Sequence, residues 1–322
     1  MESTGASTDT PAAAAAVAAG TPAFRLRGVC LGYGGARIVG PLDLDIPAGV
    51  STAIIGANGC GKSTLLRGLT RQLPLMGGSI EVLGTPVEGW PARAYARTVA
   101  LLPQSPVVPE GMSVEQLVER GRHPHRSWFG ARTRRDEAVI ASALERTELV
   151  ELAGRDIAEL SGGQRQRVWL ALVLAQETPI VLLDEPTSYL DMSHQVELLD
   201  MVRALPDPSA DGAGGADERA GGRADGQRRR ATTVSVLHEL NMAARTADFI
   251  VAMAHGQVVA SGTPADVLTP AILAEVFDLE ADVIPDPLLG HPVVLARGKG
   301  QTAAVEGGLS ASLSNGADDG AS

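Results

Sequence analysis

The residues with the clearest chemical signature form a nine-residue glycine-rich stretch at positions 56–64, Gly-Ala-Asn-Gly-Cys-Gly-Lys-Ser-Thr. An apolar run typical of a buried strand precedes it, and a run typical of a helix start follows it. Glycines allow the backbone to aim several N–H groups at one phosphate chain, and the helix N-terminus adds a positive dipole end. An isolated match could be an ordinary glycine turn. The residues predicted to bind a nucleotide, with Lys62 on the phosphates and Ser63 on Mg²⁺, are Gly56, Asn58, Gly59, Cys60, Gly61, Lys62, Ser63 and Thr64.

Two adjacent carboxylates end the apolar run at 180–183, which is typical of a fully buried parallel strand. Asp184 closes that strand, where a carboxylate is rare unless it has a partner, and Mg²⁺ is the obvious one. Glu185 follows at the mouth of the strand, where it could polarise an attacking water. The alternative for Glu185 is a carboxylate that caps a helix or forms an ion pair.

A second helix start with anion-binding character lies at Ser161-Gly162-Gly163-Gln164. Ser161 and Gln164 have the spacing of a capping box. A capping box alone does not explain the two glycines, and a helix N-terminus is a natural anion site. The chain therefore has a second candidate phosphate-contacting site besides the loop at 56–64.

Three motifs in this order, at 56–64, 160–167 and 180–186, resemble those of the ATPase subunits of ABC transporters. The resemblance covers about residues 24 to 285. It implies an α/β fold of the P-loop NTPase class, with a mostly parallel core sheet, an N-terminal antiparallel β subdomain and a helical subdomain that carries the signature motif. It also implies an enzyme that hydrolyses ATP, with ATP and Mg²⁺ as the cofactors.

The resemblance assigns roles to single residues. It makes Glu185 the general base and places His238 on the γ-phosphate, although a lone histidine at a strand end is more often structural. It makes Gln104 a residue that contacts the metal ion and the attacking water. It makes Tyr33 the aromatic residue that stacks on adenine; the alternative for Tyr33 is a hydrophobic side chain that anchors the turn. The metal ligands that it implies are Ser63, Gln104 and Asp184.

In the family, the two phosphate-contacting sites of one chain serve different nucleotides. Two subunits pack head to tail, so that Ser161, Gly162 and Gly163 of one subunit, with Gln164 behind them, close over the nucleotide bound by the other. Asp191 matches the loop that crosses this interface. The implied partners are a second copy of the chain, integral-membrane permease subunits and, indirectly, a substrate-binding protein.

Composition restricts the function classes further. The chain has 322 residues and a formal net charge of −11, which argues against a nucleic-acid partner. Its two cysteines, Cys30 and Cys60, form no disulfide framework and suggest a reducing compartment. We identify neither a targeting signal nor an apolar run of about 18 residues. The expected location is the cytoplasmic face of the cell membrane, reached through the permease.

The chain divides into an expected disordered leader at 1–22, an ATPase domain at 23–297 and a disordered tail at 298–322. Within the domain we expect a helical subdomain at about 105–175, a flexible insertion at about 206–231 and a C-terminal appendage at about 270–297. Asp136 is expected to cap a helix that runs to about Thr147. Six arginines between Arg120 and Arg135 form either a solvated face or a surface toward the membrane partner or anionic lipid.

Finer motifs resemble the importers of ferric siderophores, of the ferric enterobactin type. They lie at 102–104, 109–114, 120–125, 188–195 and 283–287, and Glu239 departs from the aspartate usual in that subgroup. A haem or cobalamin importer and an exporter subunit are the alternatives. A soluble ABC ATPase acting on nucleic acid or ribosomes is disfavoured by the single ATPase half, the absence of sustained heptads and the negative charge.

Overall fold

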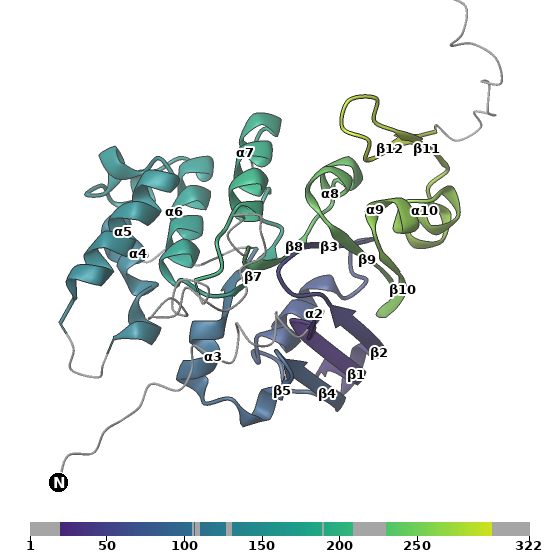
Figure 1. The fold of residues 1–322 in the computed structure, drawn as a ribbon, viewed down its shortest axis with the longest axis horizontal. Coiled ribbons are helices and arrows are strands. Elements are labelled where there is room, and N and C mark those ends of the chain that lie inside the picture. The colour runs from purple at the N-terminus through teal and green to yellow at the C-terminus, as the bar shows by residue number, and fades with distance from the viewer. Residues whose placement is uncertain are drawn as a thin grey trace, which may run out of the picture.

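The computed structural model describes residues 20–104, 106, 110–126, 131–188, 190–208 and 230–297. Residues 1–19 of the predicted leader at 1–22, residues 209–229 of the predicted insertion and the predicted tail at 298–322 lie outside these residues. The described chain forms two main sheets with helices on both sides of the larger one (Figure 1).

The larger sheet has six strands in the order β10-β9-β3-β8-β7-β6. Neighbouring strands are parallel throughout, except for the antiparallel pair β9 and β10. Parallel neighbours place their carboxyl ends at one edge, so the residues that follow β3, β6, β7 and β8 meet there. The strands are β3 (Ser51–Gly56), β6 (Val99–Leu102), β7 (Ile180–Asp184), β8 (Thr232–Val236), β9 (Phe249–Ala254) and β10 (Gln257–Gly262).

The smaller sheet is antiparallel, with the order β2-β1-β4-β5, and a separate hairpin of β11 and β12 lies near the C-terminal end of the described chain. β1 and β2 are longer than their sequence patterns indicate, because they continue up to the glycine turn after Tyr33. The bounds are β1 (Phe24–Tyr33), β2 (Ala36–Ile46), β4 (Gly77–Val82), β5 (Thr85–Pro86), β11 (Ala281–Pro285) and β12 (Pro292–Ala296).

Figure 1 shows α4, α5 and α6 as a lobe at one end of the molecule, and the antiparallel sheet below the larger one. α7 and α8 cover the upper side of the larger sheet, and α2 lies on its lower side next to β1 and β2. The α-helices are α2 (Lys62–Leu69), α3 (Ala92–Thr98), α4 (Val114–Arg120), α5 (Arg134–Arg146), α6 (Gly162–Ala175), α7 (Met192–Arg203), α8 (Leu240–Thr246), α9 (Pro264–Val267) and α10 (Pro270–Phe277). Short 3-10 turns lie at η1 (Val87–Gly89), η2 (His123–His125), η3 (Val150–Leu152) and η4 (Ile157–Glu159).

Three aliphatic cores hold these layers together. The first joins both sheets through α2 and includes Phe24, Ile54 and Leu66. The second lies on the other face of the larger sheet, under α7, α8 and α10. The third fills the lobe between α4, α5 and α6. Since α6 also packs on β6, the lobe continues directly from the edge of the larger sheet.

Capping explains where the lobe helices begin. Ser161 forms the predicted capping box of α6, and Ser113 forms another at the start of α4. The prediction for α5 is wrong by three residues, because Thr133 is the N-cap and Asp136 is its capping-box partner inside the first turn. Asp136 accepts from the backbone N–H and the hydroxyl of Thr133, at 3.0 and 2.7 Å.

The expected fold class is confirmed: a mostly parallel core sheet, an antiparallel β subdomain and a helical lobe that carries the signature motif. Of the helices in the described residues, none has the length and apolar character needed to cross a membrane.

Candidate active site

The glycine loop between β3 and α2 has the backbone geometry that its sequence predicts. Gly56, Gly59 and Gly61 have φ angles of 154°, 77° and 107°. A Cβ atom at Gly56 would lie 2.3 Å from the carbonyl oxygen of Met253, and one at Gly61 would lie 2.6 Å from Val39. Glycine is therefore required at both positions, for conformation and for space.

The side chain of Lys62 folds back onto this loop. Its side chain is buried, and its ammonium donates to the carbonyl oxygens of Gly56 and Ala57, at 2.8 and 3.0 Å. An ammonium group has three N–H donors, so two carbonyl partners leave one donor for a ligand in the loop. The positive charge of the ammonium is suited to a phosphate chain.

Ser63 and Asp184 meet across the site. The hydroxyl of Ser63 donates to Asp184 Oδ1 at 2.9 Å. Burial raises the pKa of Asp184, the Ser63 hydrogen bond opposes the rise, and the negative charge of Glu185 adds to it. A divalent cation beside the carboxylate would favour its ionised form, and a hydroxyl with a carboxylate is a donor set that suits Mg²⁺.

Three residues from three separate loops converge on one carboxylate. His238 Nε2 lies 2.5 Å from Glu185 Oε1, and the Gln104 amide donates to Glu185 Oε2 at 2.5 Å. Ser188 also donates to Oε2, at 3.3 Å. This contact fits an N–H at Nε2 of His238 that donates to the carboxylate, since an ionised carboxylate only accepts hydrogen bonds. The predicted catalytic residues Glu185, His238 and Gln104 thus form one cluster.

Glu185 itself has a left-handed backbone, with φ of 52°. This conformation is uncommon for a residue with a side chain. It turns the chain sharply at the end of β7, so that Asp184 points toward Ser63 while Glu185 points toward His238 and Gln104. The two adjacent carboxylates therefore have different partners, one suited to a metal and one suited to accept a proton.

Sequence reasoning missed the support behind the phosphate loop. Gly256 lies in the tight turn between β9 and β10. Its backbone N–H donates to the carbonyl oxygen of Cys60 at 3.0 Å, and its own carbonyl oxygen accepts from the backbone N–H of Gly40 at 2.8 Å. Gly256 has φ of 76°, and a Cβ there would lie 2.1 Å from the carbonyl oxygen of Ile38. The His-Gly pair at 255–256 is typical of a tight turn, but nothing in the sequence indicates what this turn contacts.

We expect Gly256→Ala to destabilise the protein by about 1–3 kcal/mol, from backbone strain and the clash with Ile38. Nucleotide affinity should also fall, because the turn could no longer hold Cys60 O in place. Urea unfolding and ATP titration measure the two effects. Gly154→Ala is the matched control, since nothing lies within 4 Å of a Cβ there. Equal unfolding midpoints for Gly256→Ala and the wild type would contradict this prediction.

Outside the loop at 56–64, the predicted binding residues Tyr33, Ser161, Gly162 and Asp191 are exposed, whereas Gly163 and Gln164 are half-buried. Tyr33 is 41% exposed at the end of β1, and its hydroxyl accepts from Arg67 at 2.9 Å. Its ring is thus not a buried turn anchor. Within the described part of the chain, no hydrogen bond links Ser161–Gln164 to the loop at 56–64; the Gln166 side chain instead donates to Pro186 O, at 2.8 Å, beside the Glu185 loop.

Asp191 caps α7. It accepts from the backbone N–H of His194, the hydroxyl of Ser193 and the ring of His194, which together lower its pKa to about 2. Its carboxylate is therefore ionised at neutral pH and holds the loop that follows Glu185 to the first turn of the helix.

Comparison with known proteins decides the family. The ABC transporter family profile matches residues 39–188. The ATP-binding protein of a siderophore transport system in Bacillus subtilis (strain 168) is 42% identical over 282 residues, which are 88% of this chain and 95% of that protein. The chain belongs to the ATP-binding subunits of ABC transporters. Because the ATP-binding subunits of ABC transporters are ATPases, this chain is an ATPase.

Two further similar proteins are import or metal-chelate transport subunits. A hemin import ATP-binding protein of Streptomyces coelicolor is 39% identical over 269 residues, covering 83% of this chain and 88% of that protein. A metal-chelate type ABC transporter, solved in an inward-facing conformation, superposes with a TM-score of 0.67 at 26% identity, covering 86% of this chain and 98% of that one.

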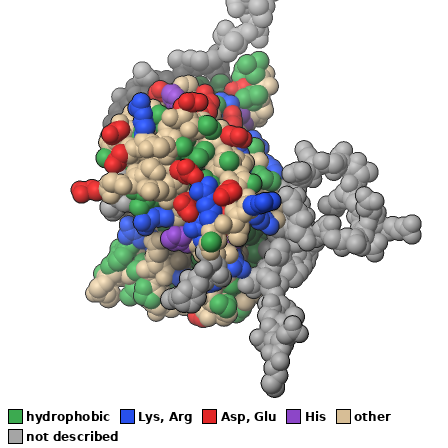
Figure 2. Space-filling view, turned by 90° about the vertical axis from the view of Figure 1, so that its left-hand side faces the viewer, with side chains coloured by type: hydrophobic (Ala, Val, Ile, Leu, Met, Phe, Trp, Pro, Cys, Tyr) green, Lys and Arg blue, Asp and Glu red, His purple; other side chains and the backbone are tan. Residues whose placement is uncertain are grey.

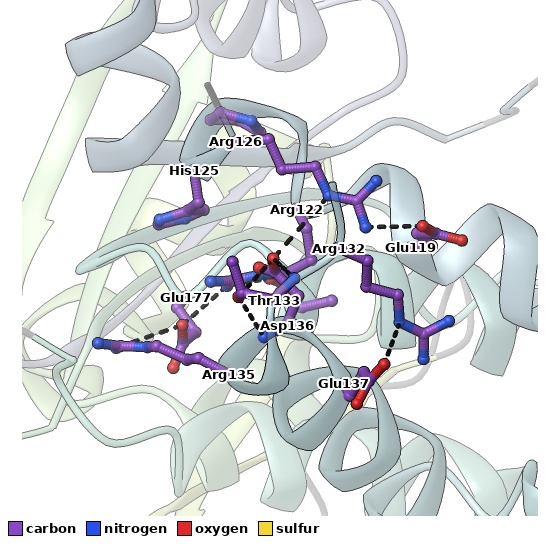
Figure 3. A network of polar contacts seen from close by, with 12 residues as sticks. Glu119, Arg122, His125, Arg126, Arg132, Thr133, Arg135, Asp136, Glu137 and Glu177 are labelled. Carbon is purple, nitrogen blue, oxygen red and sulfur yellow. Dashed lines mark hydrogen bonds and ion pairs between the residues drawn. The ribbon is translucent and has the colours of Figure 1, made fainter. Parts of the chain in front are cut away.

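The arginine-rich stretch of this ABC subunit is mostly paired internally. Arg122 is buried and binds Asp136 and Glu177, at 2.8 and 2.7 Å (Figure 3). Arg126 pairs with Glu119, and Arg132 with Glu115. On the face that this lobe presents, basic and acidic side chains are interspersed (Figure 2). These pairings favour a structural role for the stretch over a uniformly basic surface toward lipid.

Arg122→Ala should lower the free energy of unfolding by about 3–5 kcal/mol, because Asp136 would remain buried without its partner. Burial of Asp136 favours its neutral form, but the hydrogen bonds from Arg122 and Thr133 outweigh this and hold its pKa well below the ordinary value. Such a depressed pKa contributes stability above the unfolded pKa of about 3.9, and this contribution is lost on further acidification.

The difference in the free energy of unfolding between Arg122→Ala and the wild type should therefore have its largest value at pH 7 and become smaller below about pH 4. Urea unfolding at both pH values measures it. Arg120→Ala, at an exposed position two residues earlier, is the control and should change stability by less than about 0.5 kcal/mol. A difference that grows on acidification would contradict the pairing.

Proposed function

We propose that this chain is the ATP-hydrolysing subunit of an importer of ferric siderophores. The observation that carries the catalytic part is the convergence of Gln104, His238 and Ser188 on the Glu185 carboxylate. The cargo part rests on the higher identity to a siderophore transport subunit than to a hemin import subunit, and on the likeness to a metal-chelate type transporter.

In this proposal the loop at 56–64 holds the phosphates of ATP, with Lys62 neutralising their charge. Ser63 and Asp184 would hold Mg²⁺, with Gln104 completing the set; Mg²⁺ supplies charge neutralisation at the phosphate oxygens. Glu185 accepts a proton from the attacking water, and His238 orients Glu185 from its other side. Tyr33 offers an exposed ring for adenine.

The active unit in this proposal is a head-to-tail homodimer. The first turn of α6 exposes Ser161 and Gly162, and a Cβ at Gly162 would meet no atom within 4 Å. This open helix N-terminus, separate from the phosphate loop of its own chain, suits the nucleotide of a second subunit. Asp191, ionised and exposed, would lie at the same interface.

Closure and reopening of the dimer would drive a membrane permease, fed by a substrate-binding protein. The subunit would then lie peripherally on the cytoplasmic face of the cell membrane. The predicted domain limits, 23–297 with the lobe at about 105–175, are part of this proposal.

Uptake in iron-starved cells that lack the chromosomal gene tests the cargo. Cells with the wild-type chain should accumulate iron from ferric siderophores, and cells with Glu185→Gln should not. Glu239→Gln, an exposed carboxylate beside His238, is the control and should support uptake. If hemin uptake alone depends on Glu185, the cargo is haem and the siderophore proposal is wrong, while the ATPase assignment stands.

A further inference from the structure

A cavity of about 320 Å³ lies between the helical lobe and the larger sheet, apart from the ATPase site. Its walls come from α5, the last turns of α6, the start of β7 and the segment at 205–208. The described lining residues include none of those assigned above to nucleotide, metal or catalysis.

The floor of this cavity is apolar. Val173, Val181 and Leu205 line it and are 1%, 3% and 5% exposed, and Ala143 lies beside them. A cavity of this volume accommodates an organic molecule of about ten non-hydrogen atoms, on a scale of about 30 Å³ per water. The floor suits an aliphatic or aromatic body.

The polar residues of the lining are Arg135, Arg146, Ser142, Glu177 and Thr178. Glu177 is already engaged, since Arg122 binds its Oε2 at 2.7 Å and Arg135 approaches the same oxygen at 3.6 Å (Figure 3). The Arg135 side chain is 75% exposed, so this second contact is loose. Arg135 is thus able to turn toward another anion.

Arg146 is the second arginine of the lining, and its positive charge has no carboxylate partner among the described residues. In the surrounding network, Arg122, Arg126 and Arg135 are matched by three carboxylates, Glu119, Asp136 and Glu177. No residue in the described ranges forms an ion pair with Arg146, which is an exposed residue of the lining. A guanidinium on the lining of a cavity, without a counter-ion, is available to an incoming anion.

We propose that this cavity binds a small organic monoanion with an apolar body, of the size of a medium-chain carboxylate. The carboxylate lies between Arg146 and Arg135, and the body lies on the apolar floor. Because the cavity joins α5 and α6 to β7, the bound anion holds the lobe to the strand that ends at Asp184.

The probe is octanoate, measured by equilibrium dialysis against the full chain, with octanamide as its neutral analogue. Octanoate should bind saturably with a Kd of about 1 mM or lower. Octanamide should bind about tenfold more weakly, because it lacks the charge that the guanidinium requires. Shortening the chain should weaken binding about fourfold per methylene.

The variants separate this site from unspecific adsorption. Arg146→Gln should lose about tenfold in affinity, and Arg146→Lys should retain most of it. Arg134→Gln, an exposed arginine of the same helix outside the cavity lining, should bind like the wild type. Equal binding of octanoate and octanamide, unchanged binding to Arg146→Gln, or no saturation at 10-fold the expected Kd would each overturn the proposal.

Discussion

Glu185→Gln should abolish most ATP turnover while ATP binding survives. The amide cannot accept a proton from water, and general-base catalysis contributes about 10²- to 10⁴-fold to kcat. The substitution preserves shape, so the oxygen of the amide can still accept from His238 or from Gln104. We therefore expect loss of kcat with ATP affinity close to the wild type, and an ATP-bound dimer that no longer dissociates.

Steady-state phosphate release and size-exclusion chromatography with Mg²⁺ and ATP measure these two effects. Glu239→Gln is the matched control, because Glu239 is the exposed N-cap of α8 and forms no side-chain cap bond. It should retain turnover and remain able to dissociate. Wild-type turnover in Glu185→Gln would remove Glu185 from the role of general base.

Lys62→Ala should lower ATP affinity roughly 100-fold, the size expected when a buried charge-assisted contact is removed. The substitution also takes the donor from the carbonyl oxygens of Gly56 and Ala57. Part of the loss would thus come from a loop that is no longer held in shape. Titration with a fluorescent ATP analogue measures the affinity.

The composition of the chain offers a second, independent readout. Lys62 and Lys299 are its only lysines. ATP should slow acylation of Lys62 by an amine-reactive reagent and leave the rate at Lys299 unchanged. Lys299→Ala is the control for affinity and should bind ATP like the wild type. If ATP protects both lysines equally, the assignment of Lys62 to the phosphates is wrong.

Local sequence patterns determined the parts of the site that depend on single segments. The glycines at 56–64 are required because φ is positive at three of them and a Cβ would clash at Gly56 and Gly61. The capping spacing at Ser161 determined where α6 begins. The apolar run before Asp184 determined a buried strand with a carboxylate at its end. The φ angles, the capping spacing and the apolar run each depend on a few neighbouring residues, whereas the clashes at Gly56 and Gly61 involve the distant residues Met253 and Val39.

Where local signals competed, the sequence was less informative. Thr133 and Asp136 are both good N-cap residues, and their reciprocal hydrogen bonds place Thr133 at the cap. The arginines around Arg122 could equally have faced solvent. Their carboxylate partners include Glu177, 55 residues away from Arg122, so only packing of the lobe brings them together.

The tertiary structure alone decided how the catalytic residues meet. Gln104 is 81 residues from Glu185, and no local pattern relates them or His238. They meet because β6, β7 and β8 are adjacent and parallel, which places their carboxyl ends at one edge of the sheet. Strand order depends on long-range packing, so the sequence by itself specified the chemical groups while the fold set the distances between them.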